Sequence, residues 1–376
     1  MVEKIKVVHI TTVHKRTDVR ILQKECTSLA NNGYQVHLIV ADGKGDEITN
    51  SGVQIHDIGI FPGRIKRITS SYLVAFKKAM DIDATIYHLH DPELLLCGLK
   101  LKKENKKVIF DSHEDIYSNI SEKNYIPNFL KPILSFFLSL IQTYVLKRID
   151  GVISVTPHIC DKLKKVNSNV AMITNYPIIH KKDIQKGNIT KSLVFAGGVM
   201  NQWKHEFVLE ALSFCEDKNI VYNICGPTYP DYMAELQKHK NWNKVNYYGI
   251  VSKAEVEKIM SESSIGMATL SYGKNVGGKI GTIGNTKLFE YMEAGIPFIC
   301  TDFILWKEIV DKYECGICVD PTNPKQIAKA IDDLILDQEK IIKMGLNGRK
   351  AAEEVFNWSS QEKLLLGFYE KCLGDN

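Results

Sequence analysis

The chain has 376 residues, 44% of them apolar, which is more than one hydrophobic core usually serves, so its length predicts two domains. Its formal net charge is only +4 and no tract concentrates lysine or arginine. This argues against a nucleic-acid-binding protein, whose affinity would come from neutralised phosphates. The opening MVEKIKVVHI enters an apolar stretch without a leader-like core or a cleavage site, so we expect a cytoplasmic protein.

The nine cysteines are scattered singly, and only Cys315 and Cys318 have C-x-x-C spacing. No second ligand pair accompanies them, which argues against a zinc site made of cysteines. Their surroundings, ECGICVDP, read as a short strand instead of the helix N-terminus that activates a thiol. We therefore expect buried packing for both.

The first half alternates short β-branched runs with amphipathic segments. After KVVHI, a helix is predicted over 19–31, because Leu22, Cys26 and Leu29 recur at helical spacing and Gly33 follows as a stop. Strand-like runs continue with QVHLIVAD, TIYHLHD, KVIFDSHE, GVISVT and VAMITNYP. This pattern is typical of a parallel sheet covered by helices on both faces, a doubly wound Rossmann-like α/β domain over 1–180.

The most apolar segment is PILSFFLSLIQTYVL, over 132–146, flanked by Lys131, Lys147 and Arg148. It is too short and too polar for a membrane span of about 20 apolar residues. A buried helix is the favoured interpretation. The alternative is a helix lying on a membrane surface, with its basic flanks toward anionic headgroups.

A polar, aperiodic linker, NYPIIHKKDIQKGNITK, precedes a second series of strand-like runs. SLVFAGG, IVYNICG, KVNYYG, IGMATL, PFICTD and GICVD predict a second Rossmann-like domain over 190–355. A final helix is expected over 356–376, with Leu364, Leu365 and Phe368 on one stripe. Two such domains that face each other would place their ligand-binding loops around one cleft.

Several familiar nucleotide-binding patterns are absent or incomplete. The loop after KVVHI has no glycine, which removes the G-x-G-x-x-G turn of a dinucleotide dehydrogenase. The run from Gly273 to Lys279 resembles a P-loop, but Ile280 stands where a magnesium-binding hydroxyl is required. Asp81 and Asp83 form D-x-D before a strand, where a solvated loop is the better interpretation than a metal site.

The strongest signal is NTKLFEYMEAGIP, over 285–297, followed by the strand FICTD. Lys287 and Glu290 lie three residues apart, so both can face one ligand from the first helical turns. A helix N-terminus offers free amides to a diphosphate, and a carboxylate one turn later can accept from ribose hydroxyls. Glycines ahead of this helix let the backbone approach the phosphates.

These segments resemble the glycosyltransferase family 4 enzymes of GT-B fold, in a subgroup that builds bacterial surface polysaccharides. The resemblance covers essentially the whole chain and rests on TVHKRTDVRILQKE, LHDPELL, DSHEDIY, FAGG and KLFEYMEAGIP in this order. It implies two facing Rossmann-like domains with an interdomain cleft. It also implies that the C-terminal helix crosses back to the first domain.

The resemblance implies donor contacts in the second domain. Glu290 matches the second acid of the family's E-x7-E motif, which binds the donor ribose, whereas the first acidic position is Thr282, a departure that leaves the sugar open. Lys204 is placed like the basic residue that neutralises the diphosphate. Lys287 takes over the charge of the family's arginine, which here is Val199. The remaining donor contacts expected are Gly198, Gly284 and Asn285.

For the first domain, the resemblance places His113 near the reacting sugar, in a strand-end cluster with Asp111 and Glu114. Asp91 precedes Pro92, so it fits a helix N-cap, a role we favour for it over direct chemistry. The other residues expected on the acceptor side, with a solvated loop as the alternative, are His14, Arg16, Asp18 and Arg20.

The implied reaction moves a hexose-type sugar from a nucleotide-diphosphate sugar to a glycan or lipid-linked oligosaccharide, with retention of configuration. UDP is favoured over GDP. Lys204, Lys287 and helix amides can stabilise the leaving diphosphate, so no metal or other cofactor is expected. The catalytic residues expected are His113, Lys204 and Glu290.

Two alternatives stay open: a nucleotide-sugar epimerase of similar fold, and a non-catalytic subunit, which the departures at Thr282 and Val199 would suit. The expected location is cytoplasmic, with the inner face of the cell membrane as a peripheral site.

Overall fold

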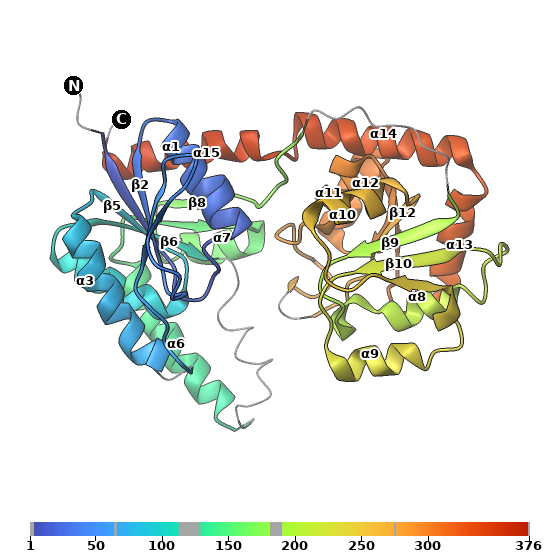
Figure 1. The fold of residues 1–376 in the computed structure, drawn as a ribbon, viewed down its shortest axis with the longest axis horizontal. Helices are drawn as coiled ribbons and strands as arrows, with labels where there is room; N and C mark the ends of the chain where they lie inside the picture. The colour runs from blue at the N-terminus through green and yellow to red at the C-terminus, as the bar shows by residue number, and fades with distance from the viewer. Residues whose placement is uncertain are drawn as a thin grey trace. The chain divides into compact units, whose positions relative to one another are not determined.

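The computed structural model describes residues 4–63, 66–112, 127, 129–180, 190–273 and 276–374 (Figure 1). The chain divides into two compact units. The first combines Met1–Asn175 with Ser359–Asn376, and the second is Tyr176–Trp358. Each unit is an α/β domain with its own sheet.

The described part of the first unit contains an eight-stranded sheet in the order β3-β4-β2-β1-β5-β6-β7-β8. Its pairs are parallel except for β3 with β4. The strands are β1 (Lys6–Ile10), β2 (Gln35–Val40), β3 (Glu47–Ile48), β4 (Gln54–Asp57), β5 (Ile86–Leu89), β6 (Lys107–Ser112), β7 (Gly151–Ser154) and β8 (Val170–Met172). The helices are η1 (Val19–Cys26), α1 (Thr27–Asn31), η2 (Arg67–Ser71), α3 (Tyr72–Ile82), η3 (Pro92–Leu94), α4 (Leu95–Lys103), α6 (Lys131–Leu146), α7 (Pro157–Lys164) and α15 (Trp358–Leu373).

Side-chain alternation gives the two faces of this sheet different chemistry. One face packs Val8, Tyr87 and Phe110 into an apolar core with α3, α4 and α6. The opposite face carries His9 and His88 toward η1 and α15. The first sheet thus has one apolar face and one face with a buried polar cluster.

The second unit has a parallel six-stranded sheet among its described residues, in the order β11-β10-β9-β12-β13-β14. Its strands are β9 (Ser192–Ala196), β10 (Val221–Cys225), β11 (Val245–Tyr247), β12 (Ile265–Ala268), β13 (Phe298–Thr301) and β14 (Gly316–Val319). Its helices are η4 (Asn201–Trp203), α8 (His205–Ala211), α9 (Pro230–Gln237), η5 (Trp242–Lys244), α10 (Lys253–Ser261), α11 (Lys287–Ala294), α12 (Ile304–Tyr313), α13 (Pro324–Ile335) and α14 (Gln338–Glu354). In Figure 1, α8 and α9 lie on one side of this sheet and α10, α11 and α12 on the other.

Local sequence explains several helix ends. Asp18 caps η1 by accepting from the backbone N–H groups of Arg20 and Ile21. Ser252 and Glu255 form a capping box at α10. Gly295 ends α11 in the left-handed region, with φ 70°.

The helix α6 is a correction to the expectation of a buried helix. It buries Gln142, Val145 and Leu146 near its C-terminal end. Large apolar side chains elsewhere on the helix are exposed, among them Phe136 at 60% and Phe137 at 57%. Apolar composition predicted burial, but only the last turns of α6 pack deeply against the unit.

Asp81 and Asp83 also differ from the expected loop. Asp81 lies in the last turn of α3, and Asp83 follows that helix in the left-handed conformation, with φ 52°. The Asp83 carboxylate pairs with Lys106 at 2.5 Å. The D-x-D sequence therefore ends a helix.

Gly266 on β12 sets how closely α11 packs against the second sheet. A Cβ atom at this position would lie 2.5 Å from the ring of Tyr291, which is completely buried and belongs to α11. The Tyr291 hydroxyl donates to the Met267 carbonyl at 2.9 Å. The absence of a side chain at Gly266 thus lets α11 lie directly on the strand.

A fully buried histidine, His205, begins α8. Its Nδ1 lies 2.9 Å from the Tyr222 hydroxyl, and its ring stands edge-on to Phe195. Burial lowers the pKa of His205 to about 3. Between about pH 6.5 and pH 3, His205 is therefore protonated in the unfolded chain but neutral in the folded unit.

Replacing Gly266 by Ala is expected to lower the free energy of unfolding by about 1–3 kcal/mol, because the new methyl group overlaps the Tyr291 ring. The control is Gly367→Ala on α15, where nothing lies within 4 Å. Helix propensity predicts stabilisation of about 0.5–1 kcal/mol there. Urea unfolding checks both, and equal midpoints for the two variants would contradict the packing argument.

The pH dependence of stability should change on replacing His205 by Gln, which keeps a polar partner for Tyr222 but does not titrate. A lowered folded pKa means that stability is lost as the pH falls below the unfolded value. From pH 7 to pH 5 this group should remove about 2 kcal/mol from the wild-type free energy of unfolding. Urea unfolding at both pH values measures the difference, and an unchanged difference in the variant would refute the assignment.

Candidate functional site

The start of α11 carries the pair that the sequence singled out. Lys287 Nζ lies 2.6 Å from Glu290 Oε2, and Thr286 Oγ1 donates to Glu290 Oε1 at 2.6 Å. The Lys287 side chain is mostly buried, at 14% exposure, whereas Glu290 is 35% exposed. The pair therefore presents one carboxylate to solvent beside a cation and the first amides of a helix.

The glycine turn after β9 lies against this pair. A Cβ atom at Gly197 would be 2.8 Å from Lys287 Cε and 3.5 Å from Lys287 Nζ. Gly197 also has φ 156°, and its N–H donates to the Cys225 carbonyl at the end of β10. The ends of β9 and β10 and the start of α11 thus converge.

Lys204 lies on the next turn of the same loop, in the left-handed conformation with φ 51°. Its Nζ donates to Asn201 Oδ1 at 2.8 Å and lies 3.5 Å from Glu206 Oε1. The turn is anchored because Thr269 Oγ1 donates to the carbonyl of the buried Trp203. The turn that carries Lys204 is therefore held at the end of β12 (Ile265–Ala268), and the Lys204 side chain contacts its own loop and the start of α8.

The other predicted donor residues belong to the two backbone segments of this site. Gly198 lies beside Met200 in the turn after β9. Gly284 N–H donates to Thr282 Oγ1 at 3.0 Å, and Asn285 Oδ1 accepts from the Lys287 N–H at 3.1 Å. Thr282, in place of an acid, is held by its carbonyl, which accepts from Trp306 Nε1 at 2.6 Å.

In the first unit, the loop after β1 is tied to the protein by its charged residues. Arg16 forms two hydrogen bonds with the Asp42 carboxylate, at 2.8 and 2.6 Å, and a third with Glu47 at 2.9 Å. Asp18 caps η1 and contacts His14 Nδ1 at 3.2 Å. Burial opposes ionisation of Asp18, but the hydrogen bond from His14 and those from the helix lower the pKa of Asp18 to about 2.

Asp91 was expected to cap the helix that follows it, and this expectation is wrong. It occupies the N-cap position of η3, but among the described residues its side chain makes no capping bond. Asp91 Oδ2 instead accepts from Thr11 Oγ1 at 3.0 Å and from the Thr12 N–H at 2.5 Å. His14 Nε2 lies 3.6 Å from the other carboxylate oxygen. The Asp91 carboxylate therefore binds donors of the loop after β1 instead of the N–H groups of η3.

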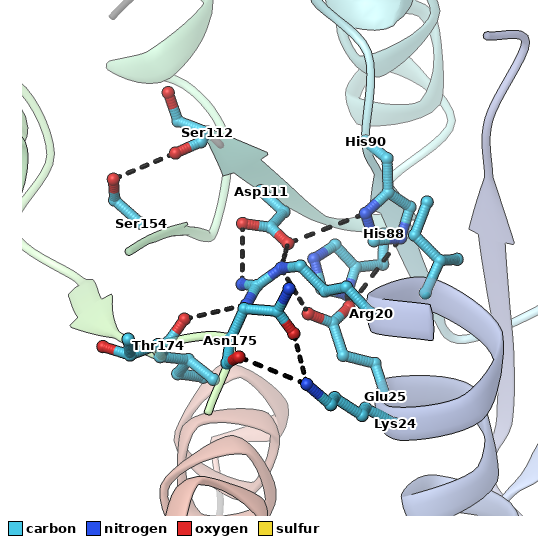
Figure 2. A network of polar contacts seen from close by, with 12 residues as sticks. Arg20, Lys24, Glu25, His88, His90, Asp111, Ser112, Ser154, Thr174 and Asn175 are labelled. Carbon is cyan, nitrogen blue, oxygen red and sulfur yellow. Dashed lines mark hydrogen bonds and ion pairs between the residues drawn. The ribbon is translucent and has the colours of Figure 1, made fainter. Parts of the chain in front are cut away.

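Arg20 lies in the interior of the first unit, within a network shown in Figure 2. It donates to both oxygens of Asp111, at 2.8 and 3.1 Å, and to the Ile173 carbonyl at 3.0 Å. Its Nε is also 3.1 Å from Glu25 Oε1. Burial alone would lower the pKa of Arg20, but Asp111 and Glu25 outweigh it and raise that pKa.

Three buried imidazoles adjoin this network. His9 Nδ1 lies 2.9 Å from His90 Nε2, and His88 Nδ1 lies 2.8 Å from the Tyr369 hydroxyl of α15. Burial, and then the neighbouring histidines, lower the pKa of His9 and of His88 well below 6.5. Burial also raises the pKa of Glu25 well above 4.5, against the effect of Arg20.

His113 and Glu114 lie outside the described residues. Their roles, and those of Arg16, Asp18, Arg20 and Asp91 toward an acceptor, stay predictions. Sequence reasoning missed the polar cluster of His9, Glu25, His88 and His90. The H-x-H spacing in YHLHD was a usable signal, because alternate strand residues share a face.

Comparison with known proteins assigns both halves of the chain. Residues 19–175 match the family described as "Glycosyltransferase Family 4". Residues 179–351 match the family described as "Glycosyl transferases group 1". Spore coat protein SA of Bacillus subtilis (strain 168) is 36% identical over 84 residues, which is 22% of this chain and only 22% of that protein's length.

Solved structures show the same fold over nearly the whole chain. Sucrose-phosphate synthase from Thermosynechococcus elongatus has a TM-score of 0.75 at 14% identity, over 99% of this chain and 100% of that one. HepE from Anabaena, in complex with UDP and glucose, has a TM-score of 0.70 at 13% identity, over 98% and 100%. With its two units matched in chain order by these two families, the protein is a family 4 glycosyltransferase with the GT-B fold.

Proposed function

We propose that this enzyme moves a hexose-type sugar from a UDP-sugar to a glycan or lipid-linked oligosaccharide, with retention of configuration, in the synthesis of a bacterial surface polysaccharide. The observation that carries the proposal is the Lys287–Glu290 pair at the start of α11, packed against the Gly197 turn. Close glycine backbone, helix amides and one cation suit a diphosphate. The adjacent carboxylate suits ribose hydroxyls.

The chemical demand is stabilisation of the leaving group. Breaking the anomeric bond leaves a nucleoside diphosphate with new negative charge, which preorganised donors stabilise most when they are fixed beforehand. Lys287 is held by Glu290, and Lys204 by its anchored turn. We propose that these two cations and the α11 amides supply this charge, so that transfer itself requires no metal.

The preference for UDP is supported by HepE, which has been solved with UDP and glucose and with UDP-glucose. Thr282 replaces the acid that the family uses to contact the donor sugar, so its hydroxyl offers a neutral contact instead. On the acceptor side we propose His113 beside the reacting sugar, with Glu114 next to it. Asp91, Arg16, Asp18 and Arg20 would shape this side by holding the β1 loop and η1.

A peripheral position on the inner face of the cytoplasmic membrane is part of the proposal, since it would bring the enzyme to a lipid-linked acceptor. It rests on α6, whose exposed apolar residues are Ile133, Leu134, Phe136, Phe137, Leu138, Leu140, Ile141 and Tyr144. Cationic side chains border the helix at Lys131, Lys147 and Arg148. An apolar surface with basic flanks is the chemistry of helices that lie on anionic bilayers.

No helix within the described residues has the length and apolar character needed to cross a bilayer. The proposed contact is therefore with the surface. Arg148 supports this arrangement. Its guanidinium lies over the Tyr144 ring, 3.5 Å from the ring centroid, so a positive charge stands next to the exposed apolar residues of α6.

Glu290→Gln and Lys204→Ala should each reduce transfer from UDP-sugar about 100-fold or more, because each removes one polar contact to the donor. Lys287→Ala should weaken UDP binding by at least about tenfold, since a cation beside the diphosphate is lost. Product formation and calorimetry with UDP measure these effects.

The matched control for the donor site is Lys307→Ala, which breaks an exposed pair with Asp311 at 2.9 Å and should leave both measurements unchanged. Near-normal turnover in folded Glu290→Gln and Lys204→Ala proteins would contradict the site. An epimerase would convert the donor without any acceptor, and a non-catalytic subunit would show neither transfer nor conversion.

The double variant Phe136→Ser with Phe137→Ser should lose most of its sedimentation with vesicles that contain anionic lipid, while UDP binding persists. Purely zwitterionic vesicles should bind the wild type more weakly, and high salt should weaken the anionic interaction. Leu336→Ser, at another exposed apolar residue, serves as the control. Equal sedimentation of all three proteins would exclude α6 as the contact, and a loss of dimer in the double variant would identify α6 as an interface between copies.

A further inference from the structure

Four buried side chains of the first unit turn metal-binding atoms toward one another. They come from β1, from β5 and its end, and from η1, and their ligand atoms all lie within 4.8 Å of one another: His9, His88, His90 and Glu25. The strand register explains the histidines. His9 on β1 lies opposite His88 on β5, and His90 follows two residues later on the same face.

The Glu25 carboxylate faces the three rings without a hydrogen bond to any of them. Glu25 Oε2 is 3.9 Å from His9 Nδ1, 3.9 Å from His88 Nδ1 and 3.9 Å from His90 Nε2. Within the described chain, Oε2 of this completely buried group has no hydrogen-bond partner, whereas Oε1 forms an ion pair with Arg20 Nε at 3.1 Å. Figure 2 shows Glu25, His88 and His90 pointing toward one another. A buried carboxyl oxygen at equal distance from three nitrogens suits a shared cation better than paired hydrogen bonds.

We propose that this cluster is a closed structural zinc site, with four ligand atoms: His9 Nδ1, His88 Nδ1, His90 Nε2 and Glu25 Oε2. Imidazole nitrogen and carboxylate oxygen are both zinc ligands, and four protein ligands without an open position are typical of structural sites. The inference goes beyond sugar transfer, because it concerns the stability of the first unit.

The spacing is close to what zinc requires. The three distances from Glu25 Oε2 to the nitrogens are 3.9 Å, and His9 Nδ1 lies 2.9 Å from His90 Nε2. Zinc lies about 2.0–2.2 Å from nitrogen and oxygen ligands, so the ligand atoms of a tetrahedral site are about 3.3–3.6 Å apart. The Glu25 oxygen would therefore approach the nitrogens by about 0.3–0.6 Å, and His9 Nδ1 and His90 Nε2 would move apart by about 0.4–0.7 Å. His9 Nδ1 and His90 Nε2, already 2.9 Å apart, would exchange their mutual contact for the ion.

The atoms of these side chains that would not bind the ion contact other polar groups, as is typical of metal-binding residues. His90 Nδ1 lies 3.7 Å from Asp111 Oδ2, and His9 Nε2 lies 3.1 Å from the Tyr369 hydroxyl. Glu25 Oε1 is 3.1 Å from Arg20 Nε. The His88 ligand atom has a partner that it would have to leave, the Tyr369 hydroxyl, now 2.8 Å away.

The rival explanation is a metal-free network in which Tyr369 and the histidines share protons. The two explanations predict opposite behaviour for two conservative variants. Glu25→Gln keeps the shape of a neutral carboxyl group, so it should be harmless in the network but should damage a zinc site. Tyr369→Phe removes two hydrogen bonds of the network but no zinc ligand.

The experiment uses the full chain, freed of any histidine tag, unfolded with a chelator and refolded with or without Zn²⁺, because a fully buried site has to be loaded during folding. We expect about one zinc per chain by elemental analysis, and a higher unfolding temperature with zinc than without it. Refolding with Co²⁺ should give the visible absorption of a four-coordinate ion.

Glu25→Gln should lower zinc affinity at least tenfold, whereas Tyr369→Phe should keep about one ion per chain. The control His37→Gln should also keep it, because this buried histidine belongs to a separate pair on the same sheet, 2.9 Å from His56. A zinc content far below one per chain, or one that Glu25→Gln does not change, would overturn the proposal. These readouts do not involve sugar transfer, so they stand or fall independently of the donor site.

Discussion

The ion pair of Arg20 with Asp111 holds the first unit together at its polar face. The guanidinium donates to both carboxylate oxygens and to the Ile173 carbonyl, and both residues are almost completely buried. Removal of one partner from such a pair costs about 3–5 kcal/mol, because the other charge is left uncompensated. The pair fastens η1 to β6 and to the segment after β8.

The helix that this pair fastens, η1, also has an unusual winding. The helix is wound as a π-helix, in which the Gln23 N–H donates to the Asp18 carbonyl five residues earlier. Such turns are rare and often occur at functional sites. With this winding, Arg20 reaches Asp111 while Glu25 reaches the histidines of β1 and β5. In the second unit, α11 is instead positioned by close packing of Tyr291 on Gly266, and Lys287 and Glu290 pair at its start.

Much of this architecture could be predicted from local patterns. The helix expected over 19–31 is present as η1 and α1, and the predicted strand runs of both halves form parallel strands of the two sheets, whereas β3 and β4 were not foreseen. KLFEYMEAGIP forms α11 with its glycine stop, and Lys287 and Glu290 meet as their spacing required. These features depend on residues within a few positions of one another.

Features that depend on distant partners were not predictable in this way. Asp91 bonds to Thr11, 80 residues away, because donors of a neighbouring strand loop are nearer than its own helix. The polar cluster joins β1, η1, β5 and α15, which only the strand order brings together. The exposure of α6 was missed because apolar composition measures the tendency to be buried, and only a complete fold shows whether a cover exists.

The contact of Tyr369 with His9 spans 360 residues, so the first unit closes only after the whole second unit, Tyr176–Trp358, has been translated. A ribosome releases β1 and then the whole of Tyr176–Trp358 before most of α15. At about 5–20 residues per second, translation of Tyr176–Trp358 takes about 10–40 s. During this interval the nascent first unit carries its histidine face without the tyrosine that completes it. The second unit can therefore complete its fold before the first unit, although most of the first unit is synthesised earlier.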